Sequence, residues 1–109
     1  MKKLEITVRP HLVDLAKEAI LRGGATGMTM SEVASWTRPR FDPSGAPHQA
    51  SGLGVKLELV VHDDLVDRVV DNLLRALGPP RPSDGEIVVG AVDEALRIRT
   101  GEIDEAAVG

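Results

Sequence analysis

Two segments of this chain repeat one pattern, an alternating stretch followed by an amphipathic helical stretch, and this repetition restricts the fold most. Residues 4–8 alternate Leu, Ile and Val with polar residues, and residues 55–61 place Val, Leu, Leu and Val on one face. A period of two predicts a half-buried strand. Apolar residues at helical spacing follow in residues 12–24 and 65–77, so we expect a helix after each strand.

Two further segments complete the expected sheet. Residues 26–36 are rich in Thr, Val and Met, and residues 86–92 read EIVVGAV, which indicates a mostly buried strand. Asp63 and Asp64 precede the second helical pattern and are expected to cap it. The resulting order is strand, helix, strand, long loop, strand, helix, strand.

This order predicts an α+β, ferredoxin-like βαββαβ sandwich in one domain over residues 1–109. Both helices would cover one face of an antiparallel sheet, with a long loop at about 36–54 between the second and third strands and a tail at about 94–109. The other sheet face would stay open. Val60 and residues 86–92 add apolar side chains to it, which favours self-association.

Composition excludes several classes of function. The chain has no cysteine, so disulfides and thiolate chemistry are absent, and its net charge of −4 argues against binding of nucleic acid by the whole surface. No run approaches the roughly 20 apolar residues of a membrane span, and the charged N-terminus is not expected to be a signal peptide. A cytoplasmic protein without membrane insertion is therefore expected.

No pattern of catalytic or metal-binding residues stands out. His11, His48 and His62 are scattered without ligand spacing, and the phosphate-binding and nucleophile motifs of common enzymes are missing. The acidic residues 101–107 are expected to form a solvated end. We expect neither an enzyme nor a metal site.

Four stretches together resemble the PII signal-transduction family over nearly the whole chain. They are MKKLEITVRP, GATGMTMSEV, VKLELVVHDDLVDRVVDNLL and SDGEIVVGAVDEALRIRTGE. The long loop also falls where that family has its partner-contacting T-loop. The resemblance implies a homotrimer with adenine nucleotide bound in the clefts between subunits, no tightly bound cofactor, and control of a membrane transporter or metabolic enzyme through the T-loop. A metal-tolerance trimer of similar shape is a second analogy, but RIRTGE does not belong to it.

The resemblance also assigns site residues. Arg97 and Arg99 alternate in RIRTGE, and on an extended segment both would point to one side, where two guanidinium groups can grip phosphates. The remaining positions that would contact nucleotide are Gly27, Met28, Thr29, Thr37, Arg38, Glu58, Val60 and Gly85. Those expected to contact a partner are Trp36, Arg40, Phe41 and His48.

Three departures from the family pattern affect the expected ligand. Ser83 and Glu86 stand where the family has a glycine and a phosphate-reaching lysine, and Pro39 replaces a glutamine that helps coordinate Mg-ATP and 2-oxoglutarate. The loop is also about four residues shorter, by comparison with the family's loop, and has no tyrosine for uridylylation. A carboxylate near phosphate is repulsive, so ADP or AMP becomes more plausible relative to Mg-ATP.

Two other interpretations remain open. The chain could be an interaction or structural module that keeps the PII scaffold without sensing ATP or 2-oxoglutarate. It could also be a PII-like adenylate sensor linked to bicarbonate or carboxysomes. Arg97 and Arg99 favour nucleotide sensing, whereas Glu86 and Pro39 favour its loss.

Overall fold

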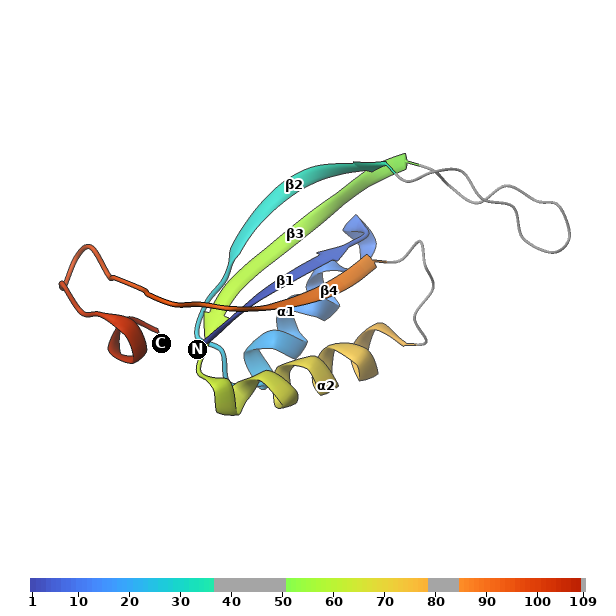
Figure 1. The fold of residues 1–109 in the computed structure, drawn as a ribbon. Coiled ribbons are helices and arrows are strands. Elements are labelled where there is room, and N and C mark those ends of the chain that lie inside the picture. The colour runs from blue at the N-terminus through green and yellow to red at the C-terminus, as the bar shows by residue number, and fades with distance from the viewer. Residues whose placement is uncertain (37–50, 79–84, 109) are drawn as a thin grey trace, which may run out of the picture.

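The computed structural model describes residues 1–36, 51–78 and 85–108. Within them, four strands and two α-helices alternate in the predicted order (Figure 1). The strands and α-helices are β1 (Lys2–Val8), α1 (Val13–Arg22), β2 (Thr29–Trp36), β3 (Ser51–Val61), α2 (Val66–Leu77) and β4 (Gly85–Ala91). Short 3-10 turns are η1 (Pro10–Leu12), η2 (Asp63–Leu65) and η3 (Asp104–Ala107).

The four strands form one antiparallel sheet in the order β2-β3-β1-β4, and both helices cover the same face (Figure 1). This confirms the predicted ferredoxin-like fold. The alternation along the central strands sets the two faces, because successive side chains of a strand point to opposite sides. Leu4, Ile6 and Leu57 are fully buried under the helices, whereas Glu5 and Glu58 between them lie on the open face.

The two helices meet at a point where only glycine fits. An ideal Cβ placed on Gly23 would lie 2.7 Å from Val69 Cγ2 and 3.0 Å from Val69 Cα. Asn72 Nδ2 also donates to the Ala19 carbonyl at 3.4 Å. Gly24, with φ of 103°, rather than Gly23, supplies the left-handed conformation after α1.

The β2–β3 hairpin is longer than expected. β2 ends at Trp36, as expected, but β3 begins at Ser51 rather than at Val55, so β3 takes up the second end of the loop expected at about 36–54. β1 pairs with β3 only from Val55 to Val61, and residues 51–54 pair with β2. The hairpin therefore continues beyond the four-stranded sheet as a two-stranded ribbon.

Two local predictions were wrong. β4 is mostly exposed rather than buried, because it is an edge strand with one neighbour, and Val88 and Val89 are each nearly half exposed. Asp63 and Asp64 do not cap α2 through a side chain, because η2 lies between them and the helix, and Leu65 is the N-cap residue.

Candidate functional site

Three of the residues expected on the adenine side come together on the open face of the sheet. Thr29 opens β2 and is the register partner of Glu58 on β3, while Val60 lies two residues further along β3 and faces Lys3 of β1. Gly27 and Met28 lead into β2, and a Cβ on Gly27 would meet nothing within 4 Å. The hairpin register thus groups residues that are about 30 positions apart in the chain.

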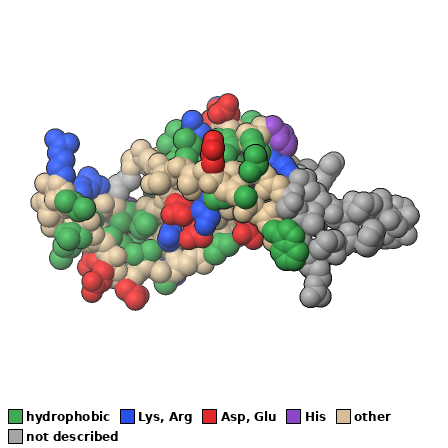
Figure 2. Space-filling model, turned by 90° about the horizontal axis from the view of Figure 1, so that it is seen from above, with side chains coloured by type: hydrophobic (Ala, Val, Ile, Leu, Met, Phe, Trp, Pro, Cys, Tyr) green, Lys and Arg blue, Asp and Glu red, His purple; other side chains and the backbone are tan. Residues whose placement is uncertain are grey.

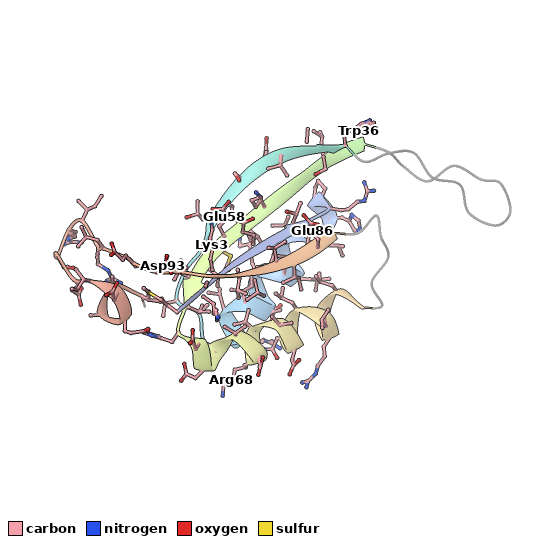
Figure 3. The ribbon with its side chains drawn as sticks, in the orientation of Figure 1. Lys3, Trp36, Glu58, Arg68, Glu86 and Asp93 are labelled. Carbon is pink, nitrogen blue, oxygen red and sulfur yellow. The ribbon has the colours of Figure 1, made fainter. Side chains whose placement is uncertain are left out.

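Glu58 is not an isolated carboxylate but part of a four-charge cluster that we call the open-face cluster: Lys3, Glu5, Lys56 and Glu58. Lys3 Nζ lies 3.1 Å from Glu5 and 3.7 Å from Glu58, and Lys56 Nζ lies 3.8 and 3.9 Å from the same two carboxylates. Figure 3 labels Lys3 and Glu58 near the middle of the sheet, and Figure 2 shows acidic and basic side chains side by side on this face. The hydrogen bond from Lys3 lowers the pKa of Glu5, and the same bond raises the pKa of Lys3.

Gly85 is required by the backbone of the sheet. It begins β4 with φ of 145°, and a Cβ at this position would collide with the carbonyl oxygen of Thr7 on β1. The expectation was that Gly85 lets backbone approach a ligand. The structure gives this glycine a packing reason that needs no ligand.

Arg97 and Arg99 lie on what we call the C-terminal arm, residues 92–108, which projects past the sheet from the end of β4 (Figure 1). The expected extended segment is wrong, because Ile98–Thr100 form a turn. Arg97 N donates to the Glu102 carbonyl and Gly101 N donates to the Arg97 carbonyl, each at 2.8 Å. This turn breaks the alternation that would have placed both guanidinium groups on one side.

Arg97 is engaged within the arm. Its Nη2 donates to the Ala107 carbonyl at 3.0 Å, and its Nη1 lies 3.9 Å from Glu102 Oε1. A guanidinium has five N–H donors, so these contacts still leave donors for a bound anion.

One subunit does not assemble the whole predicted site. Gly85 begins β4, whereas the arm leaves its other end, and a seven-residue strand spans about 20 Å. Figure 3 shows this separation, with Glu86 at one end of β4 and Asp93 beyond the other. Trp36 lies at the end of the hairpin and is strongly exposed. The remaining predicted positions lie outside the described residues: Thr37, Arg38, Pro39, Arg40, Phe41, His48 and Ser83.

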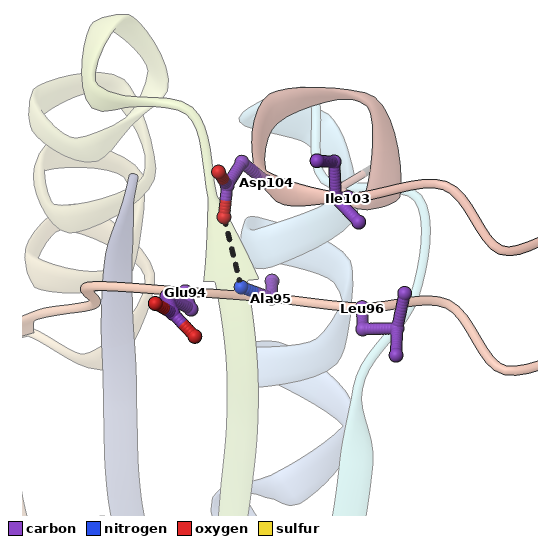
Figure 4. Close-up of a pocket in the computed structure, with 5 residues that line it drawn as sticks. All are labelled: Glu94, Ala95, Leu96, Ile103 and Asp104. Atoms are coloured by element: carbon purple, nitrogen blue, oxygen red, sulfur yellow. Dashed lines mark hydrogen bonds between the residues drawn. The ribbon is translucent and has the colours of Figure 1, made fainter.

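A shallow hollow of about 510 Å³ lies against the arm. Glu94, Ala95, Leu96, Ile103 and Asp104 line it, and Asp104 Oδ1 accepts from Ala95 N at 3.2 Å (Figure 4). Two carboxylates contribute to its lining, which makes it a poor place for phosphate groups.

A second charged cluster joins the arm to the domain, and sequence reasoning missed it. His62 Nδ1 lies 2.5 Å from Glu105 Oε2, while the N-terminal amine of Met1 lies 2.7 Å from Asp63 and 3.4 Å from Glu105. The hydrogen bond to Glu105 raises the pKa of His62, and the same bond lowers the pKa of Glu105. The acidic tail is solvated at Glu105, as expected, because this side chain is 62% exposed, but it also contacts the domain there. No spacing in the sequence links residues 43 positions apart.

Two findings concern the described part of the chain alone. No group of three or more His, Asp or Glu residues there is placed to hold a metal ion. No helix there is long and apolar enough to cross a membrane.

The fold and these positions define a class of small ferredoxin-like subunit with an extended β2–β3 hairpin and a C-terminal arm carrying arginines. The family model described as "Nitrogen regulatory protein P-II" matches residues 1–102, and the chain belongs to this PII family of nitrogen regulatory signal-transduction proteins. Members of the family act as trimeric regulators of partner proteins rather than as enzymes.

Individual relatives agree over nearly the full length. The chain is 39% identical over 112 aligned positions to nitrogen regulatory protein P-II 1 of Escherichia coli K12, covering 99% of this chain and 100% of the relative. It is 40% identical over 106 positions to the P-II protein of Bradyrhizobium diazoefficiens, covering 94% and 95%. The crystal structure of Arabidopsis thaliana PII bound to citrate superimposes with a TM-score of 0.76 at 30% identity, covering 97% of this chain and 90% of the other.

Proposed function

We propose that this chain forms a cytoplasmic homotrimer that binds adenine nucleotide in the clefts between its subunits. Binding would set the position of the segment between Trp36 and Ser51, and this segment would control a transporter or metabolic enzyme. The observation that carries the proposal is that Glu86, at the position of the family's phosphate-reaching lysine, begins β4, whereas Arg97 lies on the arm beyond the other end. Two neighbouring subunits can bring such halves together, whereas one subunit cannot.

Exposed apolar surface supports assembly. Leu96, Ile98 and Ile103 on the arm are 64%, 96% and 63% exposed in the single subunit. Val88 and Val89 on the edge strand β4 are also accessible. Burial of apolar surface of this kind is the main favourable term in subunit association.

The chemistry of the arm favours an anionic ligand. Guanidinium groups hold phosphate and carboxylate groups with paired hydrogen bonds, and the Arabidopsis PII structure contains citrate, a polyanion. In the proposed cleft Arg97 and Arg99 of one subunit would contact the phosphates. The adenine side would be lined by Gly27, Met28, Thr29, Glu58 and Val60.

Two substitutions shift the expected preference toward fewer phosphates. Glu86 is exposed on β4 and places a carboxylate where the family has a lysine, and Pro39 lacks a side-chain ligand for Mg-ATP or 2-oxoglutarate. We therefore expect ADP or AMP to bind more tightly than Mg-ATP. The same two residues support a second candidate, an interaction module on the same scaffold without nucleotide sensing.

Calorimetry with AMP, ADP and Mg-ATP, the last with and without 2-oxoglutarate, separates these candidates. Sedimentation on the same samples reports the trimer. Arg97→Ala should weaken nucleotide binding at least tenfold, while Arg75→Ala on the exposed face of α2 should leave it unchanged. Mg-ATP binding that 2-oxoglutarate strengthens would refute the stated preference. If calorimetry shows no heat of binding and no nucleotide raises the melting temperature, the interaction module is favoured.

A further inference from the structure

The C-terminal arm is tied back to its own domain by a contact between two short turns. His62 directly precedes η2, and Glu105 lies in η3, so their 2.5 Å hydrogen bond joins the domain to the returning end of the arm. Glu105 Oε1 also lies 3.4 Å from the amine of Met1. Val108, the last described residue, is buried, and its backbone N donates to the Glu105 carbonyl at 3.4 Å.

The same turn also holds Arg97. The Ala107 carbonyl that accepts from Arg97 Nη2 belongs to η3, two residues after Glu105. His62 and Arg97 therefore both contact the same short turn. Apart from Val108, the arm gains little from apolar burial, because Leu96 and Ile103, which form its β-bridge, are each more than 60% exposed. Polar contacts at η3 therefore contribute to fixing the arm, each by a small amount because the partners are exposed.

We propose that His62 and Glu105 form a protonation-dependent clasp that fixes the C-terminal arm, and with it Arg97, on its own domain. Where Arg97 binds the nucleotide as proposed above, the clasp makes nucleotide affinity depend on pH. A closed clasp orders the arm before the ligand arrives, which lowers the entropy lost on binding. With an open clasp, the arm becomes ordered only when the ligand binds, and this loss of entropy weakens binding.

The direction of the pH dependence follows from the groups around the imidazole. His62 faces the carboxylates of Glu105 and Asp64, with Asp63 and the Met1 amine beside them and the Val108 backbone on the arm. Its hydrogen bond to Glu105 raises its pKa, so the clasp is fully charged below the ordinary histidine pKa of about 6.5 and weakens as pH rises through the raised value. Glu105 has a lowered pKa, so acid opens the clasp only below its ordinary range.

The clasp itself is tested without ligand. NMR titration of His62 should give a pKa above 6.5 in the wild type and a return toward 6.5 in Glu105→Gln. Amide-exchange protection factors over residues 103–108 should fall at least threefold from pH 6 to pH 9 in the wild type. They should change less with pH in Glu105→Gln and in His62→Gln, where only the Met1 amine still titrates beside the turn. Glu94→Gln, which removes a carboxylate elsewhere on the arm, should behave as the wild type. Equal protection at both pH values in the wild type, or an unchanged His62 pKa in Glu105→Gln, would overturn the clasp.

The coupling to ligand is tested with ADP. The ratio of dissociation constants of Glu105→Gln and wild type should be at least three at pH 6 and close to one at pH 9, and ionisation of ADP cancels in this ratio. A ratio of one at both pH values, with a clasp that titrates as expected, would overturn the coupling. Absence of ADP binding in every protein would instead defeat the proposed function, while the ligand-free experiment would still decide the clasp.

Discussion

Glu5 and Glu58 lie directly opposite each other on β1 and β3, so two like charges face one another at the centre of the open sheet face. Such a pair is destabilising by itself. Lys3 and Lys56 offset the repulsion, because each lysine lies within 4 Å of both carboxylates. The four side chains act as one unit, and removal of one member should be felt by the others.

Lys3→Met should lower the melting temperature and raise the pKa of Glu5 toward its ordinary value. Glu5 has a lowered pKa in the fold, so its contribution is present above about 4.5 and is lost as pH falls through the folded value. The difference in melting temperature between wild type and variant should therefore shrink below pH 4. Carbon-detected NMR of the carboxylates and thermal unfolding from pH 3 to pH 8 measure both effects. Arg75→Met is the control, and an unchanged Glu5 pKa in Lys3→Met would contradict the prediction.

Gly23→Ala should destabilise the fold by about 1–3 kcal/mol, because the added methyl group would press on the backbone of Val69 and force the helices apart. Denaturant unfolding monitored by circular dichroism gives the free energy of unfolding. Gly27→Ala has open space around the new methyl group and should change stability by less than about 1 kcal/mol. Similar losses for both variants would rule out helix contact as the cause.

Leu73→Ala and Leu74→Ala form a matched pair on α2. Leu73 is fully buried and Leu74 is 48% exposed. Truncation of Leu73 should cost about 2–5 kcal/mol, since it removes buried methyl groups and leaves a cavity. Truncation of Leu74 should cost clearly less. Urea unfolding of the two variants checks the order, and a larger loss at Leu74 would mean that assembly buries this face of α2.

Ile98→Ser tests the role of the arm in assembly. Ile98 is 96% exposed in the single subunit, so the substitution should leave subunit stability unchanged and should weaken the proposed trimer at least tenfold. Sedimentation equilibrium measures the association constant. Leu15→Ser changes an exposed leucine on the outer side of α1 and should leave the trimer intact. Equal effects of both substitutions would argue against a specific contact at the arm.

The periodicity of apolar residues was sufficient to predict the strands and helices, but not how deeply each of them is buried. The alternation of Leu57 and Leu59 predicted β3, because a strand with one buried face places every second side chain on that face. The helices were predicted in the same way from apolar residues at helical spacing. The burial of β4 was misjudged, because a run of apolar residues looks the same in a central strand and in an edge strand. Burial of an edge depends on neighbours that a single chain does not contain.

The prediction of an extended C-terminal arm was wrong for a different reason. Leu96 and Ile98 imitate the alternation of a strand, but Gly101, with φ of 74°, allows the chain to reverse, and backbone hydrogen bonds complete the turn. The pairing of His62 with Glu105 depends on that reversal. A contact across 43 residues follows from tertiary geometry and has no local signature in the sequence.

The two-stranded end of the β2–β3 hairpin acts as a lever. Residues 51–54 extend about 13 Å past the last row shared with β1 and pair in register with β2 alone. Two-stranded ribbons twist more readily than wide sheets. Gly52 and Gly54 weaken this ribbon further, because they have no side chains to pack. A small rotation at Val55, where the wide sheet ends, would therefore displace Trp36, at the far end of the ribbon, further than Val55 itself.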